Sequence, residues 1–175
     1  MCIRDSTGTD DGAFVPAIPA ASSSGGTLTL SSSAFVEGGA LPVEYTCDGA
    51  RNSPPLSWSA IPTGTAELAL MMTTLAPDGL KWNWVLYGIP SSTTSLEKNS
   101  TGIGTLGRTS DGPLLAYSPP CSQGPGAKTY TFTLYSLSAP PVLGVPASQV
   151  TGAVLTAAIA DRTLASSQLN VSYTR

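Results

Sequence analysis

The sequence has no histidine among its 175 residues. This absence excludes Ser-His-Asp and Cys-His catalytic sites, and it excludes zinc and iron sites that need imidazole ligands. It also leaves the chain without a side chain whose ordinary pKa lies near neutrality and that could transfer protons readily. We therefore predict a protein that is not an enzyme and that uses no metal or other cofactor.

Charged residues are also scarce, at 11% of the chain, against about 25% in an average globular protein. The net charge is −3 and lysine and arginine form no cluster, so the sequence predicts no nucleic-acid partner. It also lacks the run of about 18 apolar residues that a transmembrane helix requires. Such a composition is typical of strands and loops, because exposed helices generally use Glu, Lys and Arg.

The three cysteines are Cys2, Cys47 and Cys121. Their wide spacing does not fit a metal site, which usually has pairs such as C-x-x-C. Cys47 and Cys121 could form one disulfide if the fold brings them together, and the composition resembles that of exported proteins. Two buried free thiols are the alternative, and the sequence leaves both open.

The start of the chain differs from the rest. Back-translated, MCIRDS (1–6) resembles the end of a sequencing adapter, and we expect it to be an artefact. Residues 7–26 are rich in Ser, Ala, Gly and Pro and predict a flexible linker. Such linkers often join a secretion signal or a lipid anchor to an exported domain. We therefore expect residues 27–175 to form one periplasmic or secreted domain, either free or lipid-anchored.

Alternating and continuously apolar segments predict a mainly β domain from Thr27 onward. The expected strands are TLTLSS (27–32), LPVEYTC (41–47), AELALMMTT (66–74), WNWVLYGI (82–89), KTYTFTLYSL (128–137) and SQLNVSYTR (167–175). One helix is expected over 147–164, where apolar residues recur with helical spacing after Pro146. In the segment 81–90, KWNWVLYGIP, strict alternation would place Asn83 on the opposite face from Trp82 and Trp84.

Several segments together resemble the phosphatidylethanolamine-binding protein family, and more narrowly its bacterial YbhB/YbcL-type branch, often called Raf-kinase-inhibitor-like. They are LPVEYTCDG (41–49), SPPLSW (53–58), WVLYGIP (84–90), YTFTLYSL (130–137) and the closing YTR (173–175). The resemblance implies a β-sandwich in which a large antiparallel sheet packs on a smaller one, with Greek-key connections and a C-terminal helix. It also implies a small pocket for an anionic group such as phosphate or a phospholipid headgroup.

The family builds that pocket from Asp-Pro-Asp-Ala-Pro, His-Trp-Val, Gly-Pro-Cys-Pro-Pro and His-Arg-Tyr motifs, and the matching positions here are altered. Both acids are replaced, by Thr73 and Leu75, and both histidines are replaced, by Asn83 and Lys128. By this match the pocket would comprise Thr73, Leu75, Asn83, Pro120, Lys128 and Tyr130. A nearby stretch, DGPLLAY (111–117), carries one extra residue relative to the family pattern.

Two interpretations of these replacements remain open. In the first, which we favour, the pocket is degenerate and the domain is a scaffold. In the second, Lys128 and the Asn83 amide N–H still capture a small anion. Either way the resemblance implies a binding or regulatory module, with an anionic ligand or a protein as partner; the oligomeric state is not predicted. A competing class is a carbohydrate- or surface-binding β-sandwich that uses Trp58, Trp82 and Trp84 as an exposed platform.

Overall fold

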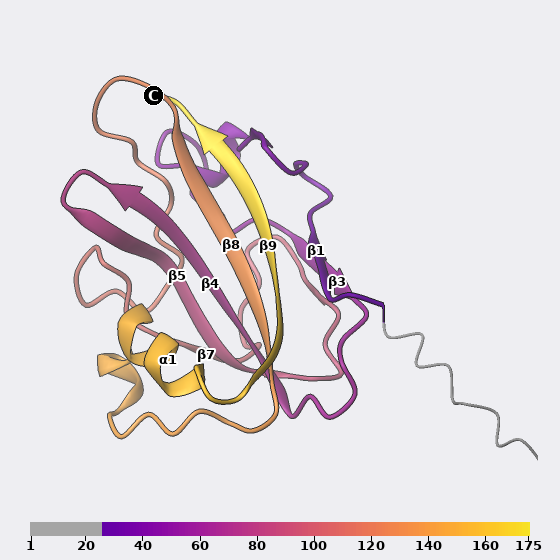
Figure 1. The fold of residues 1–175 in the computed structure, drawn as a ribbon. Coiled ribbons are helices and arrows are strands. Elements are labelled where there is room, and N and C mark those ends of the chain that lie inside the picture. Colours follow the sequence, from indigo (N-terminus) through magenta and orange to yellow (C-terminus); the bar gives the residue numbers. More distant parts are fainter. Residues whose placement is uncertain (1–25) are drawn as a thin grey trace, which may run out of the picture.

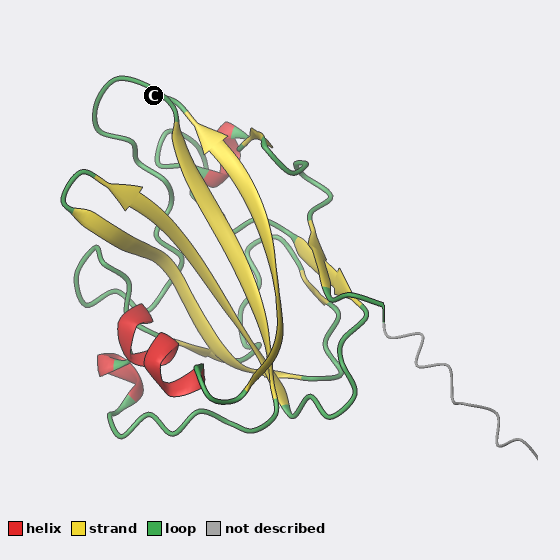
Figure 2. Cartoon of the chain, in the orientation of Figure 1, coloured by secondary structure: helices red, strands yellow, loops and turns green. Residues whose placement is uncertain are grey.

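A computed structural model describes residues 26–175 of the chain. The adapter-like segment 1–6, Cys2 and the predicted linker up to residue 25 lie outside the described residues. Within the described part, strands dominate and they form two sheets, as the sequence predicts (Figures 1 and 2).

The small sheet has the strand order β1-β3-β6 and the large sheet the order β2-β9-β8-β4-β5-β7. The small sheet consists of β1 (Thr29–Ser31), β3 (Leu56–Ser59) and β6 (Ser95–Leu96). The large sheet consists of β2 (Gly39–Ala40), β4 (Glu67–Ala76), β5 (Gly79–Pro90), β7 (Thr105–Leu106), β8 (Lys128–Leu137) and β9 (Thr163–Tyr173). All neighbouring strands are antiparallel except the short pair β2–β9.

The central strand β4 is buried on both faces over Leu68–Met72. Alternate side chains of this run enter two different cores. Leu68, Leu70 and Met72 belong to the core between the two sheets. Ala69 and Met71 belong to a second core, between the large sheet and the helix α1 (Gly152–Ile159). The continuous apolar run 66–74 therefore has the doubly buried environment that it predicts.

The helix α1 lies across one end of the large sheet, opposite the end where the chain terminates (Figure 1). Its first turn is capped by Thr151, whose Oγ1 accepts a hydrogen bond from the Val154 N–H at 3.2 Å. A Cβ on Gly152 would lie 1.9 Å from the Trp82 indole, so only glycine lets the helix approach the sheet this closely. Among residues 26–175, no helix has the length and apolar character needed to cross a membrane.

Two sequence-based predictions about local structure were wrong. The segment 41–47 is not a strand; it contains the 3₁₀ helix η1 (Val43–Tyr45), and Val43 is exposed. The turn around η1 is held locally, since Thr46 N–H donates to the Val43 carbonyl at 3.0 Å and the Thr46 hydroxyl donates to the same carbonyl at 2.8 Å.

The predicted helix 147–164 is also too long. It is split into the 3₁₀ helix η2 (Ala147–Gln149) and α1, and it ends before Thr163. The Thr163 hydroxyl donates to the Ile159 carbonyl at 2.9 Å, and Thr163 then pairs with Leu137 as the first residue of β9. Backbone pairing along β8 thus overrides the local helical spacing.

Candidate functional site

A cavity of about 280 Å³ lies beside the turn between β4 and β5 and the start of β8. These parts of the chain are at the end of the large sheet away from α1 (Figure 1). Three neighbouring strands contribute two residues each to its lining. They are Thr74 and Ala76 from β4, Lys81 and Asn83 from β5, and Lys128 and Tyr130 from β8. The rest of the wall includes Asp111, Pro119, Cys121, Ser122 and Gln123 of the connection between β7 and β8. The cavity is therefore built from the family-matched strands and a long connection.

Thr73 and Leu75, which the family match assigned to the pocket, do not line this cavity. Side chains alternate along β4, so Thr74 and Ala76 face the cavity and the odd-numbered neighbours face the other side. Leu75 is 76% exposed there. A one-residue difference in register thus decides which side chains of this strand can meet a ligand.

Asn83 occupies a β-bulge. Met72 pairs with Trp84 and Thr73 pairs with Trp82, so Asn83 is the extra residue between two consecutive pairs. The bulge breaks the alternation predicted for 81–90. Trp84 enters the core between the sheets and Trp82 packs against the helix-side core, while Asn83 turns toward the cavity.

The Asn83 side chain uses its amide N–H inside the protein, although its sequence position had suggested a donor for a ligand. Its Nδ2 donates to the Ser118 carbonyl at 3.2 Å, and the Ser118 N–H donates to the Asn83 carbonyl at 2.7 Å. Asn83 is 7% exposed, and its Oδ1 has no hydrogen-bond partner within the described part of the chain. A buried acceptor without a partner is costly, so Oδ1 is an unsatisfied polar atom in a residue that lines the cavity.

Four charged side chains line the cavity. Asp78 and Lys81 form an ion pair at 2.7 Å, with both side chains partly exposed. Asp111 accepts a hydrogen bond from the Ser118 hydroxyl. Neither Asp111 nor Lys128 forms an ion pair with any residue of 26–175. The site thus presents one carboxylate and one ammonium group without charged partners, on different elements.

Tyr130 lies in the floor of the cavity, directly opposite Thr74 in the sheet. Burial raises the pKa of the Tyr130 hydroxyl above its ordinary value, and the nearby Asp111 carboxylate raises it further. Tyr130 therefore stays a neutral hydroxyl group at physiological pH. It can donate or accept a hydrogen bond but does not add charge.

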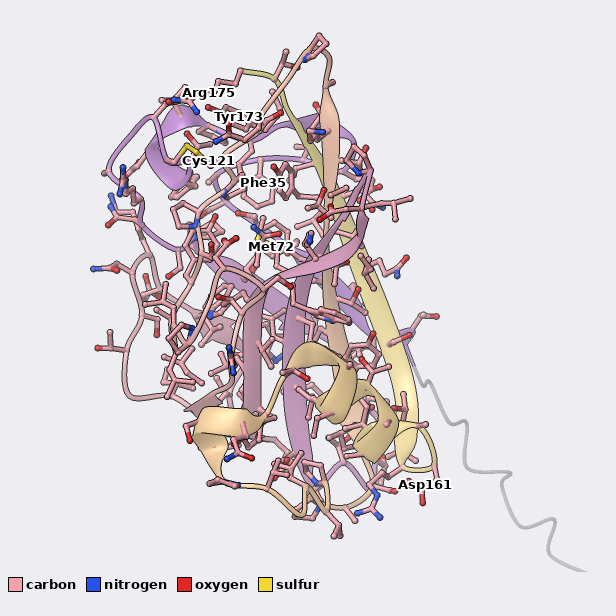
Figure 3. The ribbon with its side chains drawn as sticks, turned by 90° about the vertical axis from the view of Figure 1, so that its left-hand side faces the viewer. Phe35, Met72, Cys121, Asp161, Tyr173 and Arg175 are labelled. Atoms are coloured by element: carbon pink, nitrogen blue, oxygen red, sulfur yellow. A yellow bond between two sulfur atoms is a disulfide. The ribbon has the colours of Figure 1, made fainter. Side chains whose placement is uncertain are left out.

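A disulfide joins Cys47 to Cys121, with the two Cα atoms 5.2 Å apart and 74 residues apart in sequence. The Cys47 N–H also donates to the Pro120 carbonyl at 3.0 Å. Pro120, in the same connection, is buried and does not line the cavity. Nearby, Arg175 pairs with Asp48 at 3.1 Å, and Figure 3 shows Cys121, Tyr173 and Arg175 together at this end. These contacts anchor the connection that forms one wall of the cavity.

Comparison with known proteins identifies the family. A sequence profile described as phosphatidylethanolamine-binding protein matches residues 31–174. The chain belongs to the phosphatidylethanolamine-binding protein family. This confirms the resemblance and the β-sandwich fold expected from it.

Relatives within the family come from distant organisms. A UPF0098 protein of Methanothermobacter thermautotrophicus is 38% identical over 116 residues, which cover 63% of this chain and 76% of that protein. A Mycobacterium tuberculosis protein named as the lipoprotein LppC is 38% identical over 131 residues, covering 70% of this chain and 64% of that protein. The chain thus spans slightly under two thirds of the length of LppC.

Two solved structures share the fold. A phosphatidylethanolamine-binding protein homologue from Chlamydia trachomatis superposes with a TM-score of 0.78 at 27% identity, covering 85% of this chain and 98% of that chain. YbcL from E. coli, described as a member of the mammalian family, also has a TM-score of 0.78, at 22% identity, covering 86% and 99% of the two chains.

The competing carbohydrate-platform hypothesis is not favoured in a chain of this family. Trp58 and Trp84 are 4% and 2% exposed. Trp82 is half-buried and packs against the helix-side core, so it lies on the other face of the large sheet from Trp84. The three indoles therefore do not form one exposed platform for stacking a sugar.

The family comparison by sequence missed several cavity residues, notably Thr74, Lys81, Asp111 and Ser122. Thr74 and Lys81 follow from strand register, which the motif match does not contain. Asp111 begins the stretch DGPLLAY, and the extra residue expected there from the family resemblance was the only sequence signal that pointed to this stretch. Within residues 26–175, no group of three or more Cys, Asp and Glu side chains is placed to hold a metal ion.

Proposed function

We propose that this chain is a non-catalytic binding domain of the phosphatidylethanolamine-binding protein family, exported from the cell and lipid-anchored. The name of the relative LppC, a lipoprotein, supports the anchor, and the linker composition of residues 7–26 supports a tethered domain. A disulfide between Cys47 and Cys121 fits an oxidising, extracytoplasmic compartment.

We propose further that the cavity still binds a small ligand with an anionic group, and that Lys128 holds this group. The observation that carries the proposal is the Lys128 side chain, which lines a cavity of about 280 Å³ without an ion-pair partner in residues 26–175. A degenerate pocket would be filled by the replacing side chains, whereas Thr73 and Leu75 point elsewhere and the cavity stays open.

The replacement of both family histidines changes how this binding depends on pH. Lysine keeps its charge through the physiological range, and asparagine does not titrate. No imidazole of this protein titrates between pH 5 and 8, so the pH dependence of binding in this interval is expected to follow the ligand's own phosphate group, whose second pKa is about 6. A regulatory role toward another protein, as the name Raf-kinase-inhibitor-like implies, would be exerted from this ligand-bearing end of the domain.

Calorimetric titration with phosphoethanolamine tests the proposal. We expect saturable binding that Lys128→Ala weakens by roughly tenfold or more, because a hydrogen bond to a charged group contributes about 1.5–3 kcal/mol. Lys98→Ala is the matched control, since it removes the same charge from an exposed ion pair with Glu44 (2.8 Å) that does not line the cavity. Negligible binding by the wild-type protein, or equal weakening by both variants, would refute the proposal.

A further inference from the structure

A second cavity, of about 240 Å³, is lined by residues of the segments 51–53, 99–101 and 116–117. It shares no lining residue with the cavity that contains Lys128, which we call the Lys128 cavity. We propose that the second cavity binds a compact carboxylate with an apolar body, the carboxylate group held by Arg51 and the apolar body lying against Trp84 and Tyr117. This site is separate from the proposed function and does not depend on it.

Aromatic and aliphatic side chains form one part of the lining. Trp84 enters the core between the two sheets, where its ring meets the Tyr117 ring edge to face with the centroids 5.4 Å apart. Leu106 and Ala116 also belong to this part of the lining. Aromatic faces and edges contribute favourable contacts to a flat apolar group in addition to the area that they bury. This part of the cavity therefore suits a ligand with an apolar, ring-sized body.

The Tyr117 hydroxyl adds no negative charge to the aromatic wall. It donates a hydrogen bond to the Tyr45 carbonyl at 2.8 Å. Burial raises the pKa of Tyr117 above its ordinary value. Tyr117 is therefore a neutral phenol at physiological pH, and the wall does not repel an anionic ligand.

The second cavity contains a cation that has no partner. Arg51 is exposed and lines the cavity. Among residues 26–175, Arg51 and Lys128 are the two cationic side chains with neither an ion pair nor a side-chain hydrogen bond. The remaining cations of this part of the chain have partners; they are Lys81, Lys98, Arg108, Arg162 and Arg175. Because a guanidinium group matches the two oxygens of a carboxylate in a fork, Arg51 favours a carboxylate ligand.

Nearby acidic groups do not neutralise Arg51. Glu44 accepts a hydrogen bond from Asn52 Nδ2 at 3.3 Å and pairs with Lys98 at 2.8 Å, so its charge is already compensated. Glu97 lines a different groove. No carboxylate of the described residues lines the second cavity. The cavity thus carries the positive charge of Arg51, which an anionic group complements.

The loops that bear the polar lining are joined and locally strained. The Asn99 N–H donates to the Ser53 carbonyl at 3.0 Å, which links the two loops. Arg51 and Asn99 both have left-handed backbone, with φ of 64° and 55°. Asparagine adopts this conformation fairly often, whereas other non-glycine residues rarely do, and residues held in it are concentrated at ligand sites. The Asn99 amide and the hydroxyls of Ser100 and Thr101 can donate further hydrogen bonds to a carboxylate.

The volume of the cavity limits the size of the ligand. Sites for drug-sized molecules usually measure about 300–1,000 Å³, so a cavity of about 240 Å³ fits a smaller molecule. A single ring with a short acidic arm has this size and combines both required groups. Phenylacetate is such a molecule and serves as the probe.

Titrations followed by protein NMR with three probes separate the two parts of the ligand. Phenylacetate has both parts, phenylacetamide lacks the charge, and acetate lacks the apolar body. We expect phenylacetate to bind saturably and roughly tenfold or more tightly than either of the others, because each loses one set of contacts. The shift changes should centre on the Trp84 indole N–H and on the backbone amides of Asn99 and Thr101.

Three variants locate the site. Arg51→Gln should weaken phenylacetate binding by roughly tenfold or more, because a charge-assisted hydrogen bond becomes a neutral one, and should leave phenylacetamide binding unchanged. Thr101→Trp, at an exposed position of the lining, should weaken both by occupying the cavity. Lys128→Ala is the matched control, since it removes the other unpaired cation from the Lys128 cavity and should not affect phenylacetate binding.

Each opposite result overturns the proposal. Phenylacetamide binding as tightly as phenylacetate, or unchanged affinity in a folded Arg51→Gln variant, would refute a carboxylate site at Arg51. Acetate binding as tightly as phenylacetate would refute a role for the aromatic wall. Phenylacetate binding that Lys128→Ala abolishes would place the ligand in the Lys128 cavity instead. Absence of phenylacetate binding refutes the second site and leaves the result of the phosphoethanolamine titration unaffected.

Discussion

The two ends of strands β4 and β8 have opposite characters. At the end near α1, Leu68–Met72 of β4 is buried on both faces, and Leu134 and Leu137 of β8 are fully buried beside it. At the other end, Thr74 and Ala76 of β4 and Lys128 of β8 line an open cavity on one face. The opposite face there is uncovered, as the 76% exposure of Leu75 shows.

This difference indicates that stability and binding are separated along the same strands. The closed end has apolar side chains in two cores, which supply most of the favourable burial energy. The open end has polar groups whose partners are missing, and it is held by a disulfide and by contacts of loops. Polar replacements at the open end are therefore expected to alter binding without unfolding the domain.

The largest expected effect comes from truncating a side chain of the core, and truncation of an exposed side chain serves as the comparison. Phe132 is fully buried and stacks on Phe35 with ring centroids 5.7 Å apart, so Phe132→Ala should lower the free energy of unfolding by about 3–5 kcal/mol. Leu75→Ala, on the uncovered face, should change it by no more than about 0.5 kcal/mol. Urea unfolding of both variants measures the contrast. Similar losses would show that the open end is as tightly packed as the closed one.

The disulfide gives an effect of intermediate size at the open end. Replacing Cys47 and Cys121 together by Ser should lower the free energy of unfolding by about 2–4 kcal/mol, because a long loop regains its freedom in the unfolded state. In the wild-type protein, denatured without reductant, thiol titration should find one free thiol, Cys2. Three free thiols, or a double variant as stable as the wild type, would contradict a stabilising cross-link at this end.

The smallest expected effect concerns Glu67, the first residue of β4 at the closed end. Burial raises the pKa of Glu67 by more than a hydrogen bond from the Gly88 backbone lowers it. The folded state therefore binds the Glu67 proton more tightly than the unfolded state. Stability contributed by this group is full below the unfolded-state pKa of about 4.3 and is lost as pH rises through the higher folded-state pKa.

Glu67→Gln removes this titration and tests the sign. It should raise Tm by about 1–2 °C at pH 7 and should leave Tm nearly unchanged near pH 3.5, where Glu67 is protonated in both states. Glu97→Gln, at an exposed position, is the control for a change in net charge. A Glu67→Gln variant that is less stable at pH 7 would show that the ionised carboxylate is stabilised at this position.

Strand-forming patterns in the sequence predicted most of the fold. The two predictions of local structure that were wrong failed for identifiable structural reasons. The segments 66–74, 82–89 and 128–137 are strands because β-branched, aromatic and apolar residues dominate them. The segment 41–47 has a similar pattern but forms η1, a turn that Thr46 holds locally. The helix ends early because β9 begins at Thr163 and pairs with β8.

The candidate site was predictable in part, by family match. Asn83, Lys128 and Tyr130 do line the cavity, and whether they bind a ligand stays a prediction. Thr73 and Leu75 do not line it, since the pleat of β4 turns the even-numbered residues inward. Asp111 could not be assigned because it belongs to a long connection, whose path depends on contacts with distant residues such as Ser118 and the Cys47–Cys121 disulfide.

By itself the sequence determined which chemistry this protein lacks and which family and sheet it has, because composition and side-chain periodicity are local properties of the chain. Only the tertiary structure decided which faces of these strands meet in the cavity, since a single bulge at Asn83 and the register of β4 set the direction of each side chain. It also decided that Asp111 and Lys128, seventeen positions apart by their numbering, share one cavity without pairing. That arrangement depends on long-range contacts, which no local pattern specifies.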